Sequence, residues 1–214
     1  MIGTLVLGLR NTVLIVVLAA PLALIVGTVA VAMRVSSIIT LRVVGTLYVN
    51  IFRNIPLALL LYFSVLVLPQ TGLLPLALTR SFFVLAVASL VMYYGTFACE
   101  ALRSGINAIG RGQGEAARSL GLRNVPILRF IVIPQAARTA VPTLIVVFLQ
   151  LIRSSAIAGA FGVMELFAQM GKLAVAEPQN VIKILLLTAA LYLAITIPCG
   201  LLLGPLEKRL SVLR

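Results

Sequence analysis

Long runs of uncharged, mostly apolar residues dominate the chain, and charged residues separate them. An α-helix rises about 1.5 Å per residue, so about 20 residues cross a hydrocarbon core of about 30 Å. Four runs between consecutive charged residues meet this length, with 23, 26, 19 and 23 residues: Arg10 to Arg34, Arg53 to Arg80, Arg80 to Glu100, and Lys183 to Glu207. Each is long enough to form a membrane-spanning helix.

A fifth span needs a different argument, because Arg138 and Arg153 enclose only 14 uncharged residues. That run makes about 21 Å of helix, too short to span. Apolar residues resume after Arg153 and continue to Met164, so we expect one helix from about Thr139 to Phe161 that contains Arg153. The sequence thus predicts five spans in one membrane domain, at about residues 11–33, 55–78, 81–102, 139–161 and 184–205.

The distribution of Lys and Arg predicts how the chain is oriented. Alternate sides of the five spans receive 12 and 5 of these residues. The cytoplasmic loops of membrane proteins carry the excess of positive charge, so the N-terminus should lie outside and the C-terminus inside. Five spans do not contain an even inverted repeat of the kind that many secondary transporters have. We therefore expect the functional unit to need a second copy or a homologous partner.

Composition excludes a soluble protein. Hydrophobic residues make up 62% of the chain and charged residues 10%, whereas a typical globular domain is about half apolar and a quarter charged. A net charge of +12 would favour nucleic-acid binding in a soluble protein. Here the basic loops account for it, so we expect membrane lipid and no nucleic acid as a partner. The sequence has no His and no Asp, which argues against an intramembrane enzyme.

The predicted cytoplasmic loop, residues 103–138, has the clearest local signals. Residues 115–120 favour a helix, with Glu115 and Arg118 about one turn apart. Gly121 suits the left-handed residue that ends a helix. Asn124 can cap a second short helix, and Pro134 is expected to close the segment before the fourth span begins. The loop is thus a predicted helix–turn–helix at the inner membrane surface.

Two roles are open for Glu115, which is the only acid among six arginines in this loop. One is a local salt bridge, the usual state of a surface acid in a basic environment. The other is a docking point for a soluble partner, because Ala116, Ala117 and Gly121 would allow the partner's backbone to approach closely.

The loop resembles a known motif. Glu115-Ala116-Ala117, three residues, Gly121, nine residues and Ile131-Val132-Ile133-Pro134 are similar to the EAA loop of ATP-binding-cassette (ABC) importer permeases. Neighbouring segments narrow the resemblance to the permeases for polar amino acids. These segments are Phe52-Arg53-Asn54-Ile55-Pro56-Leu57, Glu100-Ala101-Leu102-Arg103-Ser104-Gly105-Ile106, Gly112-Gln113 and Pro134-Gln135-Ala136-Ala137-Arg138.

This resemblance implies an all-α type I ABC importer (MetI-like) permease fold and a set of partners. The chain would form half of a translocation pathway with a second permease, identical or homologous. Two cytoplasmic ABC ATPase subunits would bind the EAA loops, and an extracytoplasmic amino acid-binding protein would deliver the substrate. The residues implied to couple to the ATPase are Glu115, Ala116, Ala117, Arg118, Gly121 and Pro134. The chain has no GxxxxGK[ST] phosphate loop, so we expect ATP and Mg²⁺ in the partner and no cofactor on this chain.

Arg153 is the predicted substrate contact. It lies about 22 Å beyond Arg138 along a helix, and an arginine within the membrane normally faces a cavity or a partner. It could bind a substrate carboxylate through both oxygens, assisted by the hydroxyls of Ser154 and Ser155. The alternative is an arginine that extends to the outer interface.

Other polar residues are expected to support the structure. Glu100 should form an ion pair with Arg103 that orients the loop, and Gly105, Gln135 and Arg138 are structural positions of the resembling segments. Residues 162–183, with Glu165, Lys172 and Glu177, are expected to face the binding protein or to gate the pathway.

The resemblance is to glutamate- and glutamine-type permeases, which implies a glutamate-like substrate. Basic and amide amino acids are alternative substrates. The alternative function is a stand-alone channel or secondary carrier, which would work without an ATPase.

Overall fold

The computed structural model describes residues 1–73, 75 and 81–211, and these form helices joined by short turns. The bounds of the α-helices are α1 Ile2–Arg34, α2 Ile39–Asn54, α3 Leu57–Tyr62, α5 Phe82–Asn107, α6 Arg111–Ser119, α7 Asn124–Ile127, α8 Ile133–Ser154, α9 Leu166–Ala176 and α10 Val181–Ser211. Turns of π- or 3₁₀-helix lie at Phe63–Val67, Leu68–Thr71, Leu128–Val132, Ser155–Phe161 and Pro178–Asn180. The predicted all-α class is confirmed.

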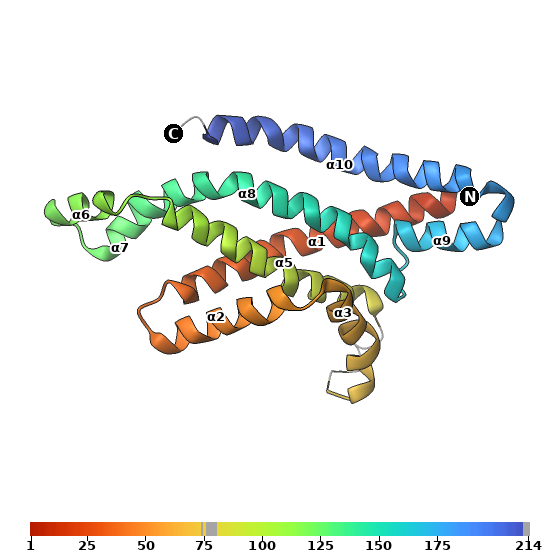
Figure 1. Cartoon of the computed structure of the whole chain (residues 1–214), viewed down its shortest axis with the longest axis horizontal. Coiled ribbons are helices and arrows are strands. Elements are labelled where there is room, and N and C mark those ends of the chain that lie inside the picture. Colours follow the sequence, from red (N-terminus) through yellow and green to blue (C-terminus); the bar gives the residue numbers. More distant parts are fainter. Residues whose placement is uncertain (74, 76–80, 212–214) are drawn as a thin grey trace.

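The long helices run side by side along the longest axis of the molecule (Figure 1). Helices α6 and α7 project at one end, which we call the α6 end. Helix α9 and the N-terminus lie at the opposite end, called the α9 end. Helix α10 begins at the α9 end and runs back toward the α6 end, so the chain travels an odd number of times between the two ends.

Four helical stretches are long and apolar enough to cross a membrane: Ile2–Arg34, Phe82–Asn107, Leu128–Phe161 and Pro178–Leu202. They overlap the expected first, third, fourth and fifth spans, with bounds that differ by up to 11 residues at one end. Helix α1 alone has 33 residues, about 50 Å of helix.

The second span differs from the expectation of a single apolar segment at residues 55–78. Helix α2 precedes it, and Ile39–Asn54 and Leu57–Thr71 are bent by 100° relative to each other. The bend has a local cause, since Pro56 disfavours helical geometry in the preceding residue and has no N–H to donate. Ile55 accordingly adopts an extended conformation with ψ of 131° and ends α2. Residues 74 and 76–78 of the expected span lie outside the described residues.

Helix α5 is the centre of the bundle, and α10 is at its edge. In their most apolar 18-residue windows, 61% of the residues of α5 but only 11% of those of α10 are buried. The main core lies between α1, α3, α5 and α8, and its fully buried members include Ile15, Ala19, Leu61, Leu90 and Ile152. Exposed apolar side chains such as Leu186 and Leu201 line the outside of α10, as expected for a surface that faces lipid or another membrane subunit.

Small residues let α1 and α5 approach closely. A Cβ added at Gly27 of α1 would lie 2.6 Å from the Cβ of Ala98 and 2.8 Å from the carbonyl oxygen of Gly95, both on α5. Contact of this kind is a common means of packing helices in membranes, where apolar lipid provides no hydrophobic driving force between them. Gly27 is therefore a packing residue.

We predict that Gly27→Ala lowers stability, while Gly3→Ala in the same helix does not. Both replacements remove a flexible glycine from a helix, which by itself is favourable by about 0.5–1 kcal/mol. Only Gly27 meets α5, because a Cβ at Gly3 has nothing within 4 Å. Overpacking typically costs about 1–3 kcal/mol, so thermal unfolding in detergent should show a midpoint several degrees lower for Gly27→Ala. Equal midpoints for the two variants would contradict this packing role.

Candidate functional site

Helix α6 projects from the α6 end and stops at a glycine turn. Gly121 has φ of +81°, in the left-handed region that glycine adopts without strain. The N–H of Leu122 donates to the carbonyl of Ala117 at 3.1 Å, and the N–H of Gly121 donates to that of Arg118 at 2.9 Å. This pair of bonds is a Schellman motif, which satisfies the last carbonyls of a helix. The predicted left-handed role of Gly121 is confirmed.

Helix α6 presents one side to its surroundings and one side to the protein. Ala117 is buried, whereas Glu115, Ala116 and Arg118 are exposed. Leu120, just before the turn, is 83% exposed. No ion pair of Glu115 occurs among the side chains that the structure describes, so the local salt bridge, one of the two roles left open for Glu115, is not found there. An exposed carboxylate beside a small residue and an apolar residue suits contact with another protein.

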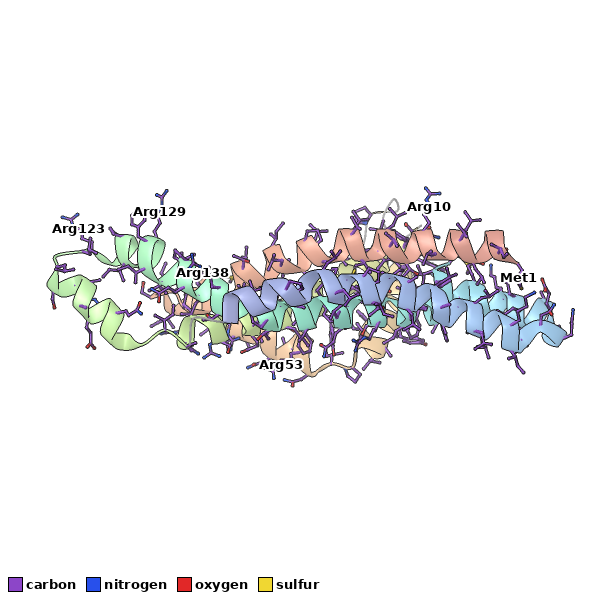
Figure 2. All side chains as sticks on the ribbon, turned by 90° about the horizontal axis from the view of Figure 1, so that it is seen from above. Met1, Arg10, Arg53, Arg123, Arg129 and Arg138 are labelled. Carbon is purple, nitrogen blue, oxygen red and sulfur yellow. The ribbon has the colours of Figure 1, made fainter. Side chains whose placement is uncertain are left out.

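Positive charge gathers at the same end. Figure 2 shows Arg123 and Arg129 extending from the ribbon at the α6 end, with Arg138 nearby and Arg10 far away toward the other end. The guanidinium of Arg129 lies 5.5 Å from the ring centre of Phe130, a distance at which a cation is attracted to an aromatic face. Arg138, expected to be structural, is exposed.

Helix α6 is connected to α8 by a side-chain bond and by the chain itself. The amide of Gln135 donates to Oε1 of Gln113 at 2.6 Å, which gives Gln135 a structural contact to α6. The prediction that Pro134 closes the loop is wrong, because helical turns continue from Asn124 through Phe161. Pro134 is instead near the start of α8, directly after the π-helical turn Leu128–Val132. Such a widened turn accommodates a proline that has no N–H to donate.

Helix α8 is in turn packed tightly on α5. A Cβ at Gly105 would lie 2.5 Å from the carbonyl oxygen of Ala136, so only glycine fits at this crossing. The hydroxyl of Thr139 also lies 3.1 Å from the carbonyl oxygen of Gly105. Contacts therefore run from α6 to α8 and from α8 to the last turns of α5.

Glu100 joins three helices at their ends. Its carboxylate lies 2.5 Å from Arg34 of α1, 3.8 Å from Arg53 of α2 and 4.0 Å from Arg103 of α5. The expected pair with Arg103 is thus present at the longest of these distances, and the main partner is Arg34, which is 66 residues away. Sequence reasoning missed Arg34 because only the packing of α1 on α5 brings the two side chains together.

The three residues of the predicted substrate contact do not share one site. Arg153 is exposed and lines a hollow of about 400 Å³ between α8 and α10, with Ala156, Tyr192, Leu193 and Thr196. Ser154 accepts a hydrogen bond from the hydroxyl of Tyr94 at 2.6 Å. Ser155 is fully buried and donates to the carbonyl of Ile152 at 2.7 Å. Arg153 alone of the three faces the hollow, because consecutive residues of a helix point in different directions.

Glu165, in the segment expected to face the binding protein or to gate the pathway, is itself buried. Its side chain has no exposed area, and it accepts hydrogen bonds from the N–H groups of Phe167 at 2.9 Å and Ala168 at 2.7 Å, which begin α9. Burial raises the pKa of Glu165 above its ordinary value, and these hydrogen bonds oppose that shift. Glu165 is the N-cap of α9, a position where Ser, Thr, Asp and Asn are preferred, so neither the cap nor its burial was evident from the sequence.

The long apolar helices and the projecting loop define a multi-pass membrane subunit, and comparison with known proteins agrees. Residues 19–212 match the family described as "Binding-protein-dependent transport system inner membrane component". The glutamate transport system permease protein GluC of Corynebacterium glutamicum is 39% identical over 198 residues, covering 89% of this chain and 86% of that protein. The probable glutamine ABC transporter permease protein GlnM of Bacillus subtilis is 33% identical over 204 residues, covering 95% and 92%.

A solved structure shares the fold as well. The crystal structure of an amino acid ABC transporter with histidines contains a chain that is 28% identical, with a TM-score of 0.87, covering 97% of this chain and 94% of that one. The chain belongs to the family of inner-membrane components of binding-protein-dependent transport systems. It is a permease subunit of an ABC importer in the inner membrane, and ATP hydrolysis resides in separate ATPase subunits. A stand-alone channel or carrier is not supported.

We predict that Arg34→Gln destabilises the protein far more than Arg103→Gln, although both arginines pair with Glu100. The side chain of Arg34 is 9% exposed and that of Arg103 is 43% exposed. Glu100 is 28% exposed, so loss of Arg34 should cost less than loss of a fully buried pair, about 3–5 kcal/mol, and more than loss of an exposed pair, about 0–1 kcal/mol. Thermal unfolding of the purified protein would show a large loss for Arg34→Gln only. Similar losses for both variants would mean that burial does not decide the strength of this cluster.

Proposed function

We propose that the chain forms half of the translocation pathway of an importer for glutamate or a similar polar amino acid. In this proposal α6 is the coupling helix that docks on an ABC ATPase subunit. The exposed Glu115, Ala116 and Arg118, followed by the Schellman turn at Gly121, carry the docking assignment. The buried Ala117 fixes the opposite side of α6.

Docking would move the membrane helices through the contacts of α6. ATP binding draws the two ATPase subunits together, and each docked α6 moves with them. Gln113 and Gln135 join α6 to α8, and the tight crossing at Gly105 joins α8 to α5. Such coupling requires that the contacts differ between the two states of the ATPase, since equal contacts in both would shift no equilibrium. Hydrolysis then returns the spans to their first position.

The complete importer would comprise several other subunits. Two ATPase subunits, which hold ATP and Mg²⁺, would bind at the α6 end, where basic residues gather (Figure 2). A second permease, identical or homologous, would provide the other half of the pathway. An extracytoplasmic amino acid-binding protein would dock at the α9 end. This arrangement puts the N-terminus outside and the C-terminus inside.

The proposed substrate contact is Arg153. It is exposed in a hollow whose other lining includes the hydroxyl-bearing Tyr192 and Thr196. A planar guanidinium binds a carboxylate through two parallel hydrogen bonds, and every amino acid has an α-carboxylate. The names of the relatives, a glutamate and a glutamine permease, favour an acidic or amide side chain. Ser154 and Ser155 are left out of this site because neither is among the residues that line the hollow.

We predict that Gly121→Val weakens coupling while Gly110→Ala does not. Gly121 has φ of +81°, which a β-branched residue adopts only with strain, whereas Gly110 has φ of −59° and no neighbour within 4 Å. In reconstituted vesicles, Gly121→Val and Glu115→Lys should lower both uptake and the ATPase activity stimulated by the loaded binding protein, about tenfold or more if over 1.4 kcal/mol of coupling is lost. Normal coupled transport in both variants would refute the docking role.

We predict that Arg153→Ala weakens binding of L-glutamate to the assembled permease–ATPase complex, measured without the binding protein. Loss of a charge-assisted contact worth about 1.5–3 kcal/mol should raise the dissociation constant roughly 10- to 100-fold. Arg10→Ala is the control, because Arg10 is also exposed, lies toward the α9 end (Figure 2) and does not line the hollow. Unchanged affinity in Arg153→Ala would reject the substrate contact without affecting the docking role of α6.

A further inference from the structure

The carboxylate of Glu165 connects three elements that are distant in sequence. Besides the two N–H groups at the start of α9, it accepts a hydrogen bond from the hydroxyl of Tyr192 on α10 at 2.8 Å. The hydroxyl of Thr12 on α1 lies 3.4 Å from the same oxygen, Oε2. Glu165 is therefore bonded to α9 and α10 and lies within hydrogen-bond distance of α1.

Thr12 also bonds directly to the start of α9. Its hydroxyl accepts a hydrogen bond from the N–H of Leu166 at 3.1 Å, and its own hydrogen can be directed to Gly8 O or to Glu165. Two glycines leave room for the arrangement. A Cβ at Gly8 would lie 2.8 Å from the Cα of Leu166, and a Cβ at Gly159 would overlap a carboxylate oxygen of Glu165.

Tyr192 belongs to this cluster and also to the wall of the Arg153 hollow. Its hydroxyl is bonded to Glu165, and Tyr192 is also one of the residues that line the hollow, with Arg153 and Thr196. Tyr192 thus connects the hollow with the buried end of α9. A group bound in the hollow would contact a tyrosine whose position Glu165 determines.

We propose that Glu165, Thr12 and Tyr192 form a clamp that couples the position of α9 to occupancy of the Arg153 hollow. Glu165 and Thr12 are positioning residues in this clamp, and Tyr192 is its contact with the bound molecule. Helix α9 lies beside the N-terminal part of α1 at the α9 end (Figure 1), where the proposed binding protein would dock. The part of the inference that concerns a bound amino acid rests on the function proposed above; the clamp itself does not.

The clamp can be tested by backbone hydrogen–deuterium exchange of residues 162–176 in the assembled permease–ATPase complex in lipid nanodiscs. Tyr192→Phe retains the ring and removes the hydroxyl that binds Glu165. Thr188→Val is the matched control, because Thr188 is a buried residue of the same helix whose hydroxyl donates to the carbonyl of Ile184 within that helix. Without ligand, we expect exchange about tenfold faster in Tyr192→Phe, the size of effect that loss of one buried charge-assisted hydrogen bond produces. Thr188→Val should stay within about twofold of the wild type.

A second pair of variants guards against general misfolding. Thr12→Ser keeps the hydroxyl that Leu166 and Glu165 use, and Thr12→Val removes it with little change in shape. Fast exchange in Thr12→Val with near-normal exchange in Thr12→Ser supports the clamp. Equal acceleration in Tyr192→Phe and Thr188→Val, or none in Tyr192→Phe, overturns it.

The response to ligand is measured by adding L-glutamate at a saturating concentration for each variant. In the wild type, glutamate should slow exchange of residues 162–176, and in Tyr192→Phe that slowing should be lost. Bound glutamate that leaves α9 unchanged in the wild type overturns the coupling. Absence of glutamate binding to the wild type instead contradicts the proposed substrate, and the exchange without ligand then decides the clamp.

Discussion

The lack of water in a hydrocarbon core is the constraint on which this structure depends. Backbone N–H and C=O groups there must bond to each other, so the chain crosses as long helices and changes direction only at defined residues. Pro56 ends α2 and produces the 100° bend before residues 57–71. The same constraint makes small residues valuable, since Gly27 and Gly105 bring helix backbones together where apolar burial contributes little to association.

Two carboxylates show how the bundle accommodates charge at its opposite ends. Glu100 is partly exposed and lies among three arginines, so ion pairs join the ends of α1, α2 and α5. Glu165 is fully buried and is surrounded by neutral donors, which satisfy its oxygens without a second charge. A carboxylate is costly to remove from water without partners. Each of these two carboxylates has partners on more than one helix.

A continuous series of helical turns runs between these two ends of the bundle. Helical turns continue from Asn124 to Phe161, so the segment that begins beside α6 ends beside the Arg153 hollow. The π-helical turn Leu128–Val132 interrupts regular bonding near its start, a feature often found at functional sites in helices. Helix α6 itself joins this segment through the turn at Gly121 and through the bond between Gln113 and Gln135.

Much of this protein follows from local sequence alone. The absence of charges over about 20 residues identifies membrane helices because any unpaired charge there would be costly. The turn at Gly121 follows from the unique backbone freedom of glycine. The bend at Pro56 could also have been predicted from the local sequence, although a single span was expected over residues 55–78.

Only the tertiary structure decided which distant groups meet. Arg34 became the main partner of Glu100 through the packing of α1 on α5. Glu165 became buried because Thr12 and Tyr192, on two other helices, converge on it. Arg153 lines the hollow while Ser154 and Ser155 bond to other groups, because consecutive residues of a helix point in different directions. The physical reason is the same in each case: periodicity along the chain determines which face a residue occupies, but contacts across helices determine what that face touches.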